Sequence, residues 1–260
     1  MPPGVRFERA EIHPHLSGQW ALPAGAARSS AILWLHGGAF LVGSSNSYRA
    51  FAAHLAVAAG VAVFVPDYRL LPEHPFPAAT IDTQHALEWL ERQGIAPHAI
   101  GIGGDSAGAN LAAGAVQARL EAGHAPPGAC WLLSGWLDLT HSGGSIATRS
   151  AADPFISAAG MPVGAQAYLR DADPKDPRAS PLFGPMHGFP PTLIQVGEDE
   201  VLFDDSWRMA LALKQAGREV IFQEWAGMMH VFPFFLSHLD EAHAAIAQAG
   251  IVFRRRLLGE

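Results

Sequence analysis

A serine flanked by two glycines is the side chain of this sequence best placed to act as a nucleophile. Residues 104–108 are Gly-Asp-Ser-Ala-Gly, with Ser106 at the centre. Small and apolar residues at 99–103 predict a buried strand before the motif, and residues 109–113 predict a helix after it. Gly-x-Ser-x-Gly between a strand and a helix is typical of a nucleophile elbow, a sharp turn that presents the serine hydroxyl. Because the chain has 27 glycines, the motif alone can arise by chance, and the strand and helix around it carry the prediction.

A general base is needed as well, because serine is a weak nucleophile at neutral pH. The candidate is His230, which follows the predicted strand at 220–225. The chain has thirteen histidines, and we interpret most of the others as exposed polar residues or as core residues with satisfied rings. A histidine base also needs a carboxylate that orients its ring and stabilises the imidazolium.

Three consecutive acidic residues supply candidates for that carboxylate. Glu198, Asp199 and Glu200 follow the predicted strand at 192–196. Only one of them can orient the histidine. The others are explained by the next helix, because its dipole favours acidic side chains near the N-terminus. The residues alone therefore leave open which carboxylate orients His230.

Backbone N–H groups are expected to stabilise the charge that develops when a serine attacks a carbonyl. Gly37 and Gly38 follow the predicted strand at 31–35, and paired glycines allow a substrate oxygen to approach the backbone closely. Ala107, next to Ser106, would supply a further N–H group. These three residues are the predicted oxyanion hole, whereas we interpret His36 as structural.

Apolar runs and helical patterns alternate along the chain and predict a parallel α/β architecture. Predicted strands cover residues 31–35, 61–65, 99–103, 130–133, 192–196 and 220–225. Predicted helices cover residues 48–59, 80–93, 109–122, 204–216 and the closing segment 234–258. In a doubly wound sheet the active site lies at the carboxyl ends of the strands, and each candidate residue above follows a strand.

A single domain over residues 1–260 is expected, with two departures from the regular alternation. Residues 5–20 alternate weakly within the short N-terminal segment 1–30 and predict an edge hairpin. Residues 141–188 are rich in Pro, Gly and Asp and are interpreted as a cap-like insertion over the site, helical around 161–169.

Composition excludes several classes of function. A net charge of −7 argues against a general nucleic-acid binder. The sequence contains no segment of signal-peptide or membrane-spanning length, so a cytoplasmic protein is expected. The single cysteine, Cys130, lies in an apolar run and is interpreted as a buried structural thiol. No cofactor or metal is expected, because the sequence has no His-Glu-x-x-His pattern and no paired cysteine motif. His13 and His15 could share one face of a strand, but no third ligand accompanies them.

Several motifs in order resemble the hormone-sensitive-lipase-like branch of the α/β-hydrolases, the bacterial carboxylesterases. They are His-Gly-Gly-Ala at 36–39, Asp-Tyr-Arg-Leu-Leu-Pro-Glu at 67–73 with Phe-Pro-Ala-Ala at 76–79, Gly-Asp-Ser-Ala-Gly at 104–108, Ser-Pro-Leu at 180–182 and Pro-Pro-Thr at 190–192. The resemblance runs from about residue 36 to the last helix and implies an α/β-hydrolase fold. It also implies that Arg69 and Glu73 are structural charges that fix a loop beside the site.

The resemblance implies a catalytic order of serine, acid and histidine. The family's acid is followed two places on by Leu and four places on by Asp, which selects Glu200 and leaves Asp199 as the fallback. The implied reaction is ester hydrolysis through an acyl-enzyme on Ser106. Phe40 and Met229 adjoin the oxyanion loop and His230 and are predicted to line the substrate pocket.

The substrate and the assembly are less closely defined. The short N-terminal segment implies a reduced cap, an open site and short-to-medium acyl or compact bulky esters. A lactone or amide hydrolase, such as a formamidase, would use the same three residues. A non-catalytic receptor on this fold is disfavoured because the serine, acid and histidine are all present. The resemblance also allows a homodimer through the last strand and helix.

Overall fold

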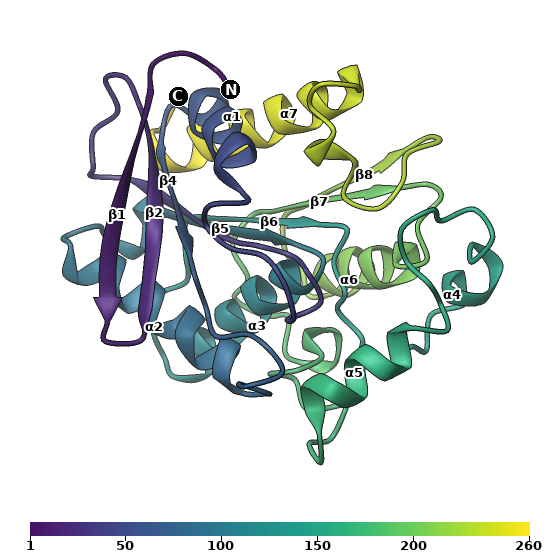
Figure 1. Cartoon of the computed structure of the whole chain (residues 1–260). Helices are drawn as coiled ribbons and strands as arrows, with labels where there is room; N and C mark the ends of the chain where they lie inside the picture. The colour runs from purple at the N-terminus through teal and green to yellow at the C-terminus, as the bar shows by residue number, and fades with distance from the viewer.

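The computed structural model describes residues 1–260 and contains one eight-stranded sheet. The strands are β1 (Val5–His13), β2 (Leu16–Pro23), β3 (Ala31–Leu35), β4 (Ala62–Pro66), β5 (Ile100–Asp105), β6 (Ala129–Leu133), β7 (Thr192–Gly197) and β8 (Val220–Trp225). Their order in the sheet is β1-β2-β4-β3-β5-β6-β7-β8 (Figure 1). The strands from β4 to β8 along this order are parallel, while β2 runs antiparallel to β4 and β1 antiparallel to β2.

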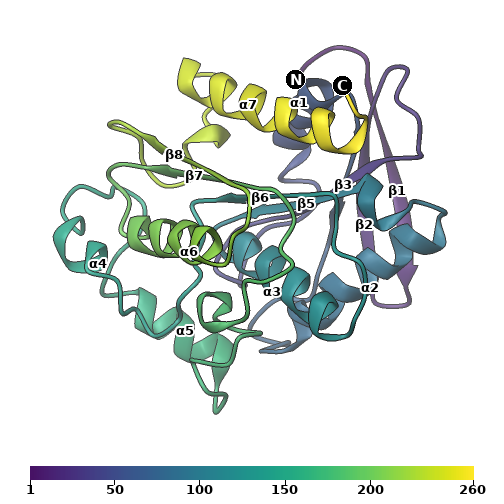
Figure 2. The ribbon, with the colours of Figure 1, turned by 180° about the vertical axis from the view of Figure 1, so that it is seen from behind.

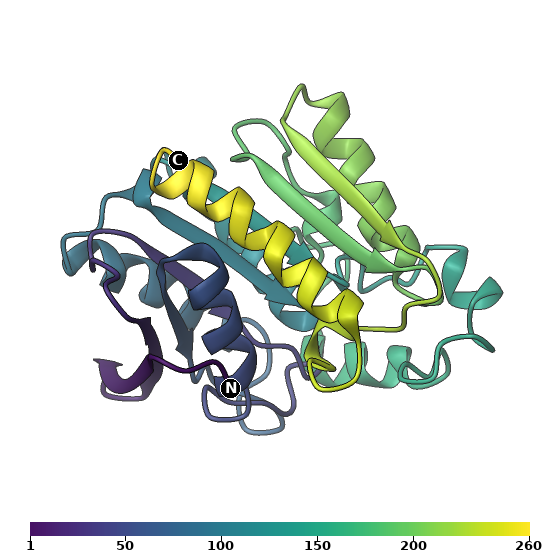
Figure 3. The same ribbon diagram turned by 90° about the horizontal axis from the view of Figure 1, so that it is seen from above.

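Helices cover both faces of the sheet. The longer ones are α1 (Arg49–Ala59), α2 (Ala78–Arg92), α3 (Ala107–Glu121), α6 (Phe203–Gln215) and α7 (Asp240–Leu257). Helices α1 and α7 lie together on one face, whereas α2, α3 and α6 lie on the other (Figures 2 and 3). This arrangement explains why β3 to β7 are buried along their whole length, since a sheet covered on both sides exposes neither face to water.

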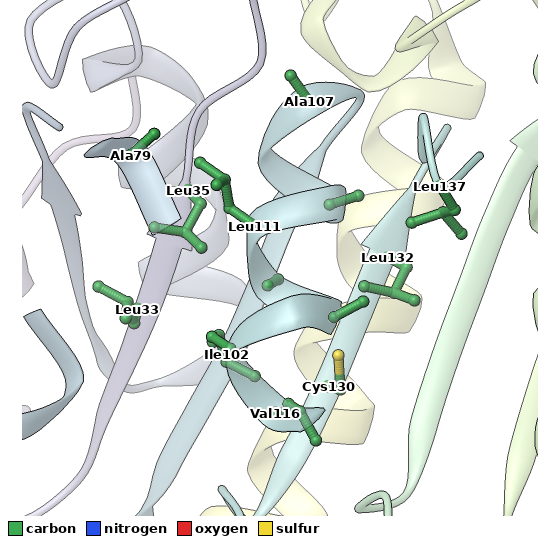
Figure 4. Packing of buried hydrophobic residues seen from close by; sticks show 14 of the residues in the cluster. Leu33, Leu35, Ala79, Ile102, Ala107, Leu111, Val116, Cys130, Leu132 and Leu137 are labelled. Atoms are coloured by element: carbon green, nitrogen blue, oxygen red, sulfur yellow. The ribbon is translucent and has the colours of Figure 1, made fainter. Parts of the chain in front are cut away.

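The larger apolar core lies between the sheet and the helices α2, α3 and α6. Leu33, Ile102 and Leu132 project from three neighbouring strands toward Leu111 and Val116 of α3 (Figure 4). The free thiol of Cys130 is fully buried in this core, and burial raises its pKa, as expected for a structural cysteine.

The remaining elements are short and lie mainly between β6 and β7. They are α4 (Ser145–Thr148), α5 (Met161–Leu169) and the 3-10 turns η1 (Pro97–Ala99), η2 (Pro181–Phe183) and η3 (Phe232–Phe234). Residues 141–188, called the cap segment below, hold α4, α5 and η2, and these lie at the end of the molecule beneath β7 and β8 in Figure 1. No helix of the molecule is both long enough and apolar enough to cross a lipid bilayer.

The predicted α/β fold, the parallel sheet and the edge hairpin are confirmed, and one local prediction is wrong. The closing helix begins at Asp240 and not near 234, because Pro233 lies in the turn η3 and Leu239 is extended. Trp207 on α6 is 48% exposed, in contrast to Met209 and Leu213, which are fully buried on the same helix. Its ring instead packs edge-on against Phe222 of the edge strand β8.

Candidate active site

Ser106 occupies a strained turn between β5 and α3. Its backbone angles are φ 52° and ψ −118°, a conformation that is costly for any residue with a side chain. Its N–H donates to Leu133 O at 2.9 Å, and its carbonyl accepts from Trp136 N at 3.1 Å, so the end of β6 and the loop after it hold the turn in place. The glycine at 108 is required by packing, because a Cβ there would lie 1.9 Å from Leu35 O. The structure therefore has the predicted elbow geometry around Ser106.

His230 and Glu200 form a buried pair in the loops that follow β8 and β7. Glu200 Oε2 lies 2.8 Å from His230 Nδ1, and the Glu200 side chain is fully buried. Its other oxygen, Oε1, accepts from Gly197 N at 2.6 Å. Asp199, the fallback acid, is only partly buried, and its carboxylate makes no contact with His230. Glu200 is thus the carboxylate that can orient the ring.

No hydrogen bond joins Ser106 to His230 in this structure. In enzymes without bound substrate such a contact is often long and tightens only in the substrate complex. His230 and Ser106 are both largely buried, at 7% exposure each. The Glu200 contact through Nδ1 leaves the Nε2 atom of His230 as the nitrogen that can receive a proton.

The charge around His230 favours its protonated form. Burial lowers the pKa of His230, but the hydrogen bond and the negative charge of Glu200, with the charges of Asp153 and Asp105, outweigh it and raise the pKa above 6.5. A base with a raised pKa accepts a proton more readily, which is the property that serine activation requires.

One of the three predicted oxyanion donors, the Gly37 N–H, is already hydrogen-bonded within the protein. The Gly37 N–H donates to Tyr48 Oη at 2.7 Å and to Asp105 Oδ1 at 3.2 Å, so it is not free to bind a substrate oxygen. The N–H groups of Gly38 and Ala39 have no hydrogen-bond partner. The Ala107 N–H, at the first position of α3, has no partner within the helix. The free donors of this loop are therefore the N–H groups of Gly38 and Ala39, whereas the sequence predicted those of Gly37 and Gly38.

Asp105, the variable residue inside the serine motif, holds the oxyanion loop against the elbow. Its carboxylate accepts from Tyr48 Oη at 2.7 Å and from Trp34 Nε1 at 3.3 Å, in addition to Gly37. Burial raises the pKa of Asp105 to about 7, against the opposing effects of these hydrogen bonds and of the charge on His230. The sequence alone gave no sign that this side chain would occupy the Gly37 N–H.

A second loop, residues 67–73, supports the oxyanion loop from behind. Tyr68 Oη donates to His36 O at 2.6 Å, and the ring of His36 stacks on that of Tyr68, in keeping with a structural role for His36. Arg69 forms an ion pair with Asp82 at 2.8 Å, which fits its predicted structural role. Glu73 is exposed and forms no ion pair, so the prediction that it fixes the loop is wrong.

Ser134 was not identified from the sequence. Its Oγ donates to Glu200 Oε1 at 2.7 Å and accepts from Val231 N at 3.2 Å, which links the acid loop to the histidine loop. Ser134 has a positive φ of 49° and follows β6, and its place after a strand is the only signal that the sequence offered. We interpret it as a residue that positions Glu200 and His230.

A cavity of about 190 Å³ opens beside Ser106 and differs from the predicted pocket. It is lined by Ala39, Ser106, Trp136, Leu202 and six residues of the cap segment, Phe155, Ile156, Ser157, Gly160, Met161 and Gly164. Neither Phe40 nor Met229 lines it. Phe40 is fully buried behind the cavity, because its ring stacks on that of Tyr168 with centroids 3.7 Å apart.

Substitution of Gly38 tests whether the N–H groups of Gly38, Ala39 and Ala107 form the oxyanion hole. Its φ is +112°, and a Cβ would lie 2.1 Å from Val42 O, so Gly38→Ala must shift the loop. We expect kcat to fall by about 10²–10³-fold, the usual cost of losing an oxyanion donor. Gly25→Ala is the control, because Gly25 has a φ of +78° but open space around it. Unchanged kcat for folded Gly38→Ala, measured below its Tm, would contradict this role.

Comparisons with known proteins identify the family that this chain resembles. A family model described as an alpha/beta hydrolase fold matches residues 32–234. An acetyl-hydrolase of Streptomyces hygroscopicus is 42% identical over 246 residues, which cover 95% of this chain and 82% of the relative. An esterase of Acinetobacter venetianus is 40% identical over 228 residues, covering 87% of this chain and 75% of that protein.

Solved structures agree with these relatives. An esterase from the bacterial hormone-sensitive lipase family matches with a TM-score of 0.95 and 37% identity, over 99% of this chain and 87% of that one. The esterase EstE5, in crystals soaked with p-nitrophenyl butyrate, matches with a TM-score of 0.94 and 36% identity, over 99% of this chain and 86% of that one.

The chain therefore belongs to the α/β-hydrolase family. Its resemblance to the hormone-sensitive-lipase-like esterases, predicted from the sequence motifs, is confirmed. The predicted class of enzyme, the carboxylic ester hydrolases, is confirmed at the level of this family.

Proposed function

We propose that this chain is a serine carboxylesterase that hydrolyses esters of short acyl groups through an acyl-enzyme on Ser106. The observation that carries the proposal is the buried Glu200–His230 pair, at 2.8 Å, beside a serine held in a strained elbow. A receptor that had lost catalysis would have no need of this arrangement. The curated relatives named acetyl-hydrolase and esterase support the same reading.

The first half of the reaction forms the acyl-enzyme. His230 Nε2 takes the proton of the Ser106 hydroxyl as its oxygen attacks the ester carbonyl. The N–H groups of Gly38, Ala39 and Ala107 stabilise the negative charge on the carbonyl oxygen. Glu200 holds the ring and stabilises the imidazolium. The tetrahedral intermediate then collapses, and His230 gives the proton to the departing alcohol.

The second half releases the acid. A water molecule, deprotonated by His230, attacks the acyl carbonyl, and the same backbone donors stabilise the second tetrahedral intermediate. Collapse returns the proton to Ser106. The chain's own residues supply every proton transfer in this sequence.

The cavity supports a preference for short acyl groups. Its volume of about 190 Å³ is smaller than the roughly 300–1,000 Å³ of pockets for drug-sized ligands. Met161 of α5 and Trp136 both line it, and both are largely buried. A short acyl chain can enter this space, whereas a long one would have to displace residues of the cap segment.

Hydrolysis of p-nitrophenyl esters from acetyl to dodecanoyl tests the proposal. We expect kcat/KM to peak between acetyl and butyryl and to fall at least tenfold for the longest chains, because a misplaced carbonyl loses its alignment. Met161→Ala enlarges the cavity and should shift the peak toward longer chains, whereas Val163→Ala, on the exposed face of α5, should not.

Two results would contradict the proposal. A peak at dodecanoyl would exclude the short-acyl preference. Turnover of lactones or amides without any turnover of simple esters would replace the esterase by a hydrolase of those bonds that uses the same three residues.

A further inference from the structure

Three histidines and one aspartate meet where the β1–β2 hairpin packs on α2, outside the Ser106 cavity. His13 ends β1, and His15 lies in the turn that leads into β2. Asp82 and His85 are three residues apart on α2 and therefore share one face of that helix. The two histidines noted in the sequence thus acquire neighbours from a segment about 70 residues away.

The donor atoms of this cluster lie close together. His15, Asp82 and His85 each offer one ligand atom, and these atoms all lie within 4.8 Å of one another. His15 Nε2 is 3.4 Å from Asp82 Oδ1, and His15 Nδ1 is 3.0 Å from His13 Nδ1. The ring of His13 also stacks on that of His85, with centroids 5.4 Å apart.

The hydrogen bonding of Asp82 and His85 bears on whether they can bind a ligand. The Asp82 side chain is fully buried, and Arg69 fixes both of its oxygens: the backbone N and Nε of Arg69 donate to Oδ2 at 2.9 Å, and Nη2 donates to Oδ1, the oxygen that faces His15, at 2.8 Å. The Nδ1 atom of His85 is buried and has no hydrogen-bond partner. A buried polar atom without a partner is uncommon and calls for an explanation.

We propose that His15, Asp82 and His85 bind a divalent transition-metal ion, with Zn²⁺ the best match to two imidazole nitrogens and one carboxylate. The contact between the Nδ1 atoms of His13 and His15 fits a supporting role for His13. A metal-bound histidine commonly donates its other ring N–H to a neighbouring acceptor, which fixes the ring. A water molecule would complete a tetrahedral site.

The position of the proposed metal site indicates a structural role and not a catalytic one. The site joins the edge hairpin to α2 and contributes no atom to the Ser106 cavity. The ligand atoms must close from their present spread to bonds of about 2.0–2.2 Å, and the exposed turn that carries His15 can supply that movement. Arg69 competes for the Asp82 carboxylate, so we expect micromolar rather than very tight binding.

The test is calorimetric titration of the chelator-treated full chain with ZnCl₂ at about pH 7.5. We expect one Zn²⁺ per chain and a rise in Tm with added metal. His15→Gln and His85→Gln should each abolish saturable binding. His13→Phe should weaken it by about 10–100-fold, the usual effect of removing a supporting partner. Ester turnover should be the same with and without metal.

A second histidine pair provides the control. The rings of His54 and His243 lie 5.4 Å apart. His54→Gln/His243→Gln should bind Zn²⁺ as the unaltered chain does. The absence of saturable binding, binding that survives in folded His15→Gln and His85→Gln, or binding lost in the control variant would each overturn the proposal. Circular dichroism of every variant verifies the fold.

Discussion

Replacement of Ser106 by alanine is expected to reduce kcat for p-nitrophenyl butyrate by roughly 10⁶-fold, the loss seen when a serine hydrolase loses its nucleophile. The variant retains the oxyanion donors and the cavity, so a small residual rate over water should persist. Alanine also lacks only the hydroxyl, and it can take the same backbone position as Ser106 with little change in packing. We therefore expect substrate binding and Tm to change far less than kcat. Steady-state kinetics and a thermal melt measure both.

Ser150→Ala is the matched control for this substitution. Ser150 is exposed and forms no hydrogen bond, so its removal should leave kcat within about twofold, as is usual for surface changes. A folded Ser106→Ala enzyme that retained more than a tenth of the activity would exclude Ser106 as the nucleophile. In that case the strained turn would need another explanation.

Glu200→Gln is expected to reduce kcat by about 10⁴-fold and to change the pH profile. Glutamine keeps the shape of the side chain but can donate to His230 Nδ1, which favours the wrong tautomer. The negative charge of Glu200 also raises the pKa of His230 above 6.5, after burial has lowered it. His230 must be neutral to accept the serine proton, so activity is lost as pH falls through that raised pKa. Without the charge the pKa drops, and the acid limb of kcat/KM should move to lower pH.

Asp199→Asn distinguishes the two carboxylates proposed from the sequence. Asp199 lies in the same loop but does not contact His230, so this variant should keep both the rate and the acid limb of the unaltered enzyme. If Asp199→Asn loses activity and Glu200→Gln does not, Asp199 is the acid and the 2.8 Å contact of Glu200 is structural.

The features predicted correctly from sequence are those that depend on neighbouring residues in the chain. The strands β3 to β7 are short, buried and largely apolar, and β8 at the sheet edge follows the same pattern less regularly, with Gln223 and Glu224 in it. The candidates Ser106, Glu200 and His230 each follow one of these strands. In a parallel sheet the carboxyl ends of the strands share an edge, which is why residues far apart in sequence gather there. Local pattern and topology were sufficient to predict where these three residues lie, whereas their catalytic roles stay a proposal.

The features that were missed depend on contacts between distant segments. Gly37 is an unsuitable oxyanion donor only because Asp105 and Tyr48 take its N–H. Phe40 is excluded from the cavity because Tyr168, in the cap segment, covers its ring. His85 joins His15 only because α2 packs beside the hairpin. None of these contacts has a signature in the local sequence.

The cap-like role of residues 141–188, a homodimer and a cytoplasmic location stay predictions. The cap-like role agrees with the cavity, because six of the ten residues that line the cavity come from this segment. The edge strand β8 is the strand through which the predicted dimer would form. Size-exclusion chromatography with light scattering measures the oligomeric state directly.

Covalent trapping of the intermediate tests the central claim most directly. The enzyme is mixed with p-nitrophenyl butyrate, quenched in acid within milliseconds, digested and analysed by mass spectrometry. The account predicts one butyryl group on the peptide that contains Ser106, formed together with a burst of p-nitrophenol, and none in Ser106→Ala. Turnover without any acylated peptide, or a butyryl group on a different residue, would contradict the acyl-enzyme mechanism proposed for Ser106.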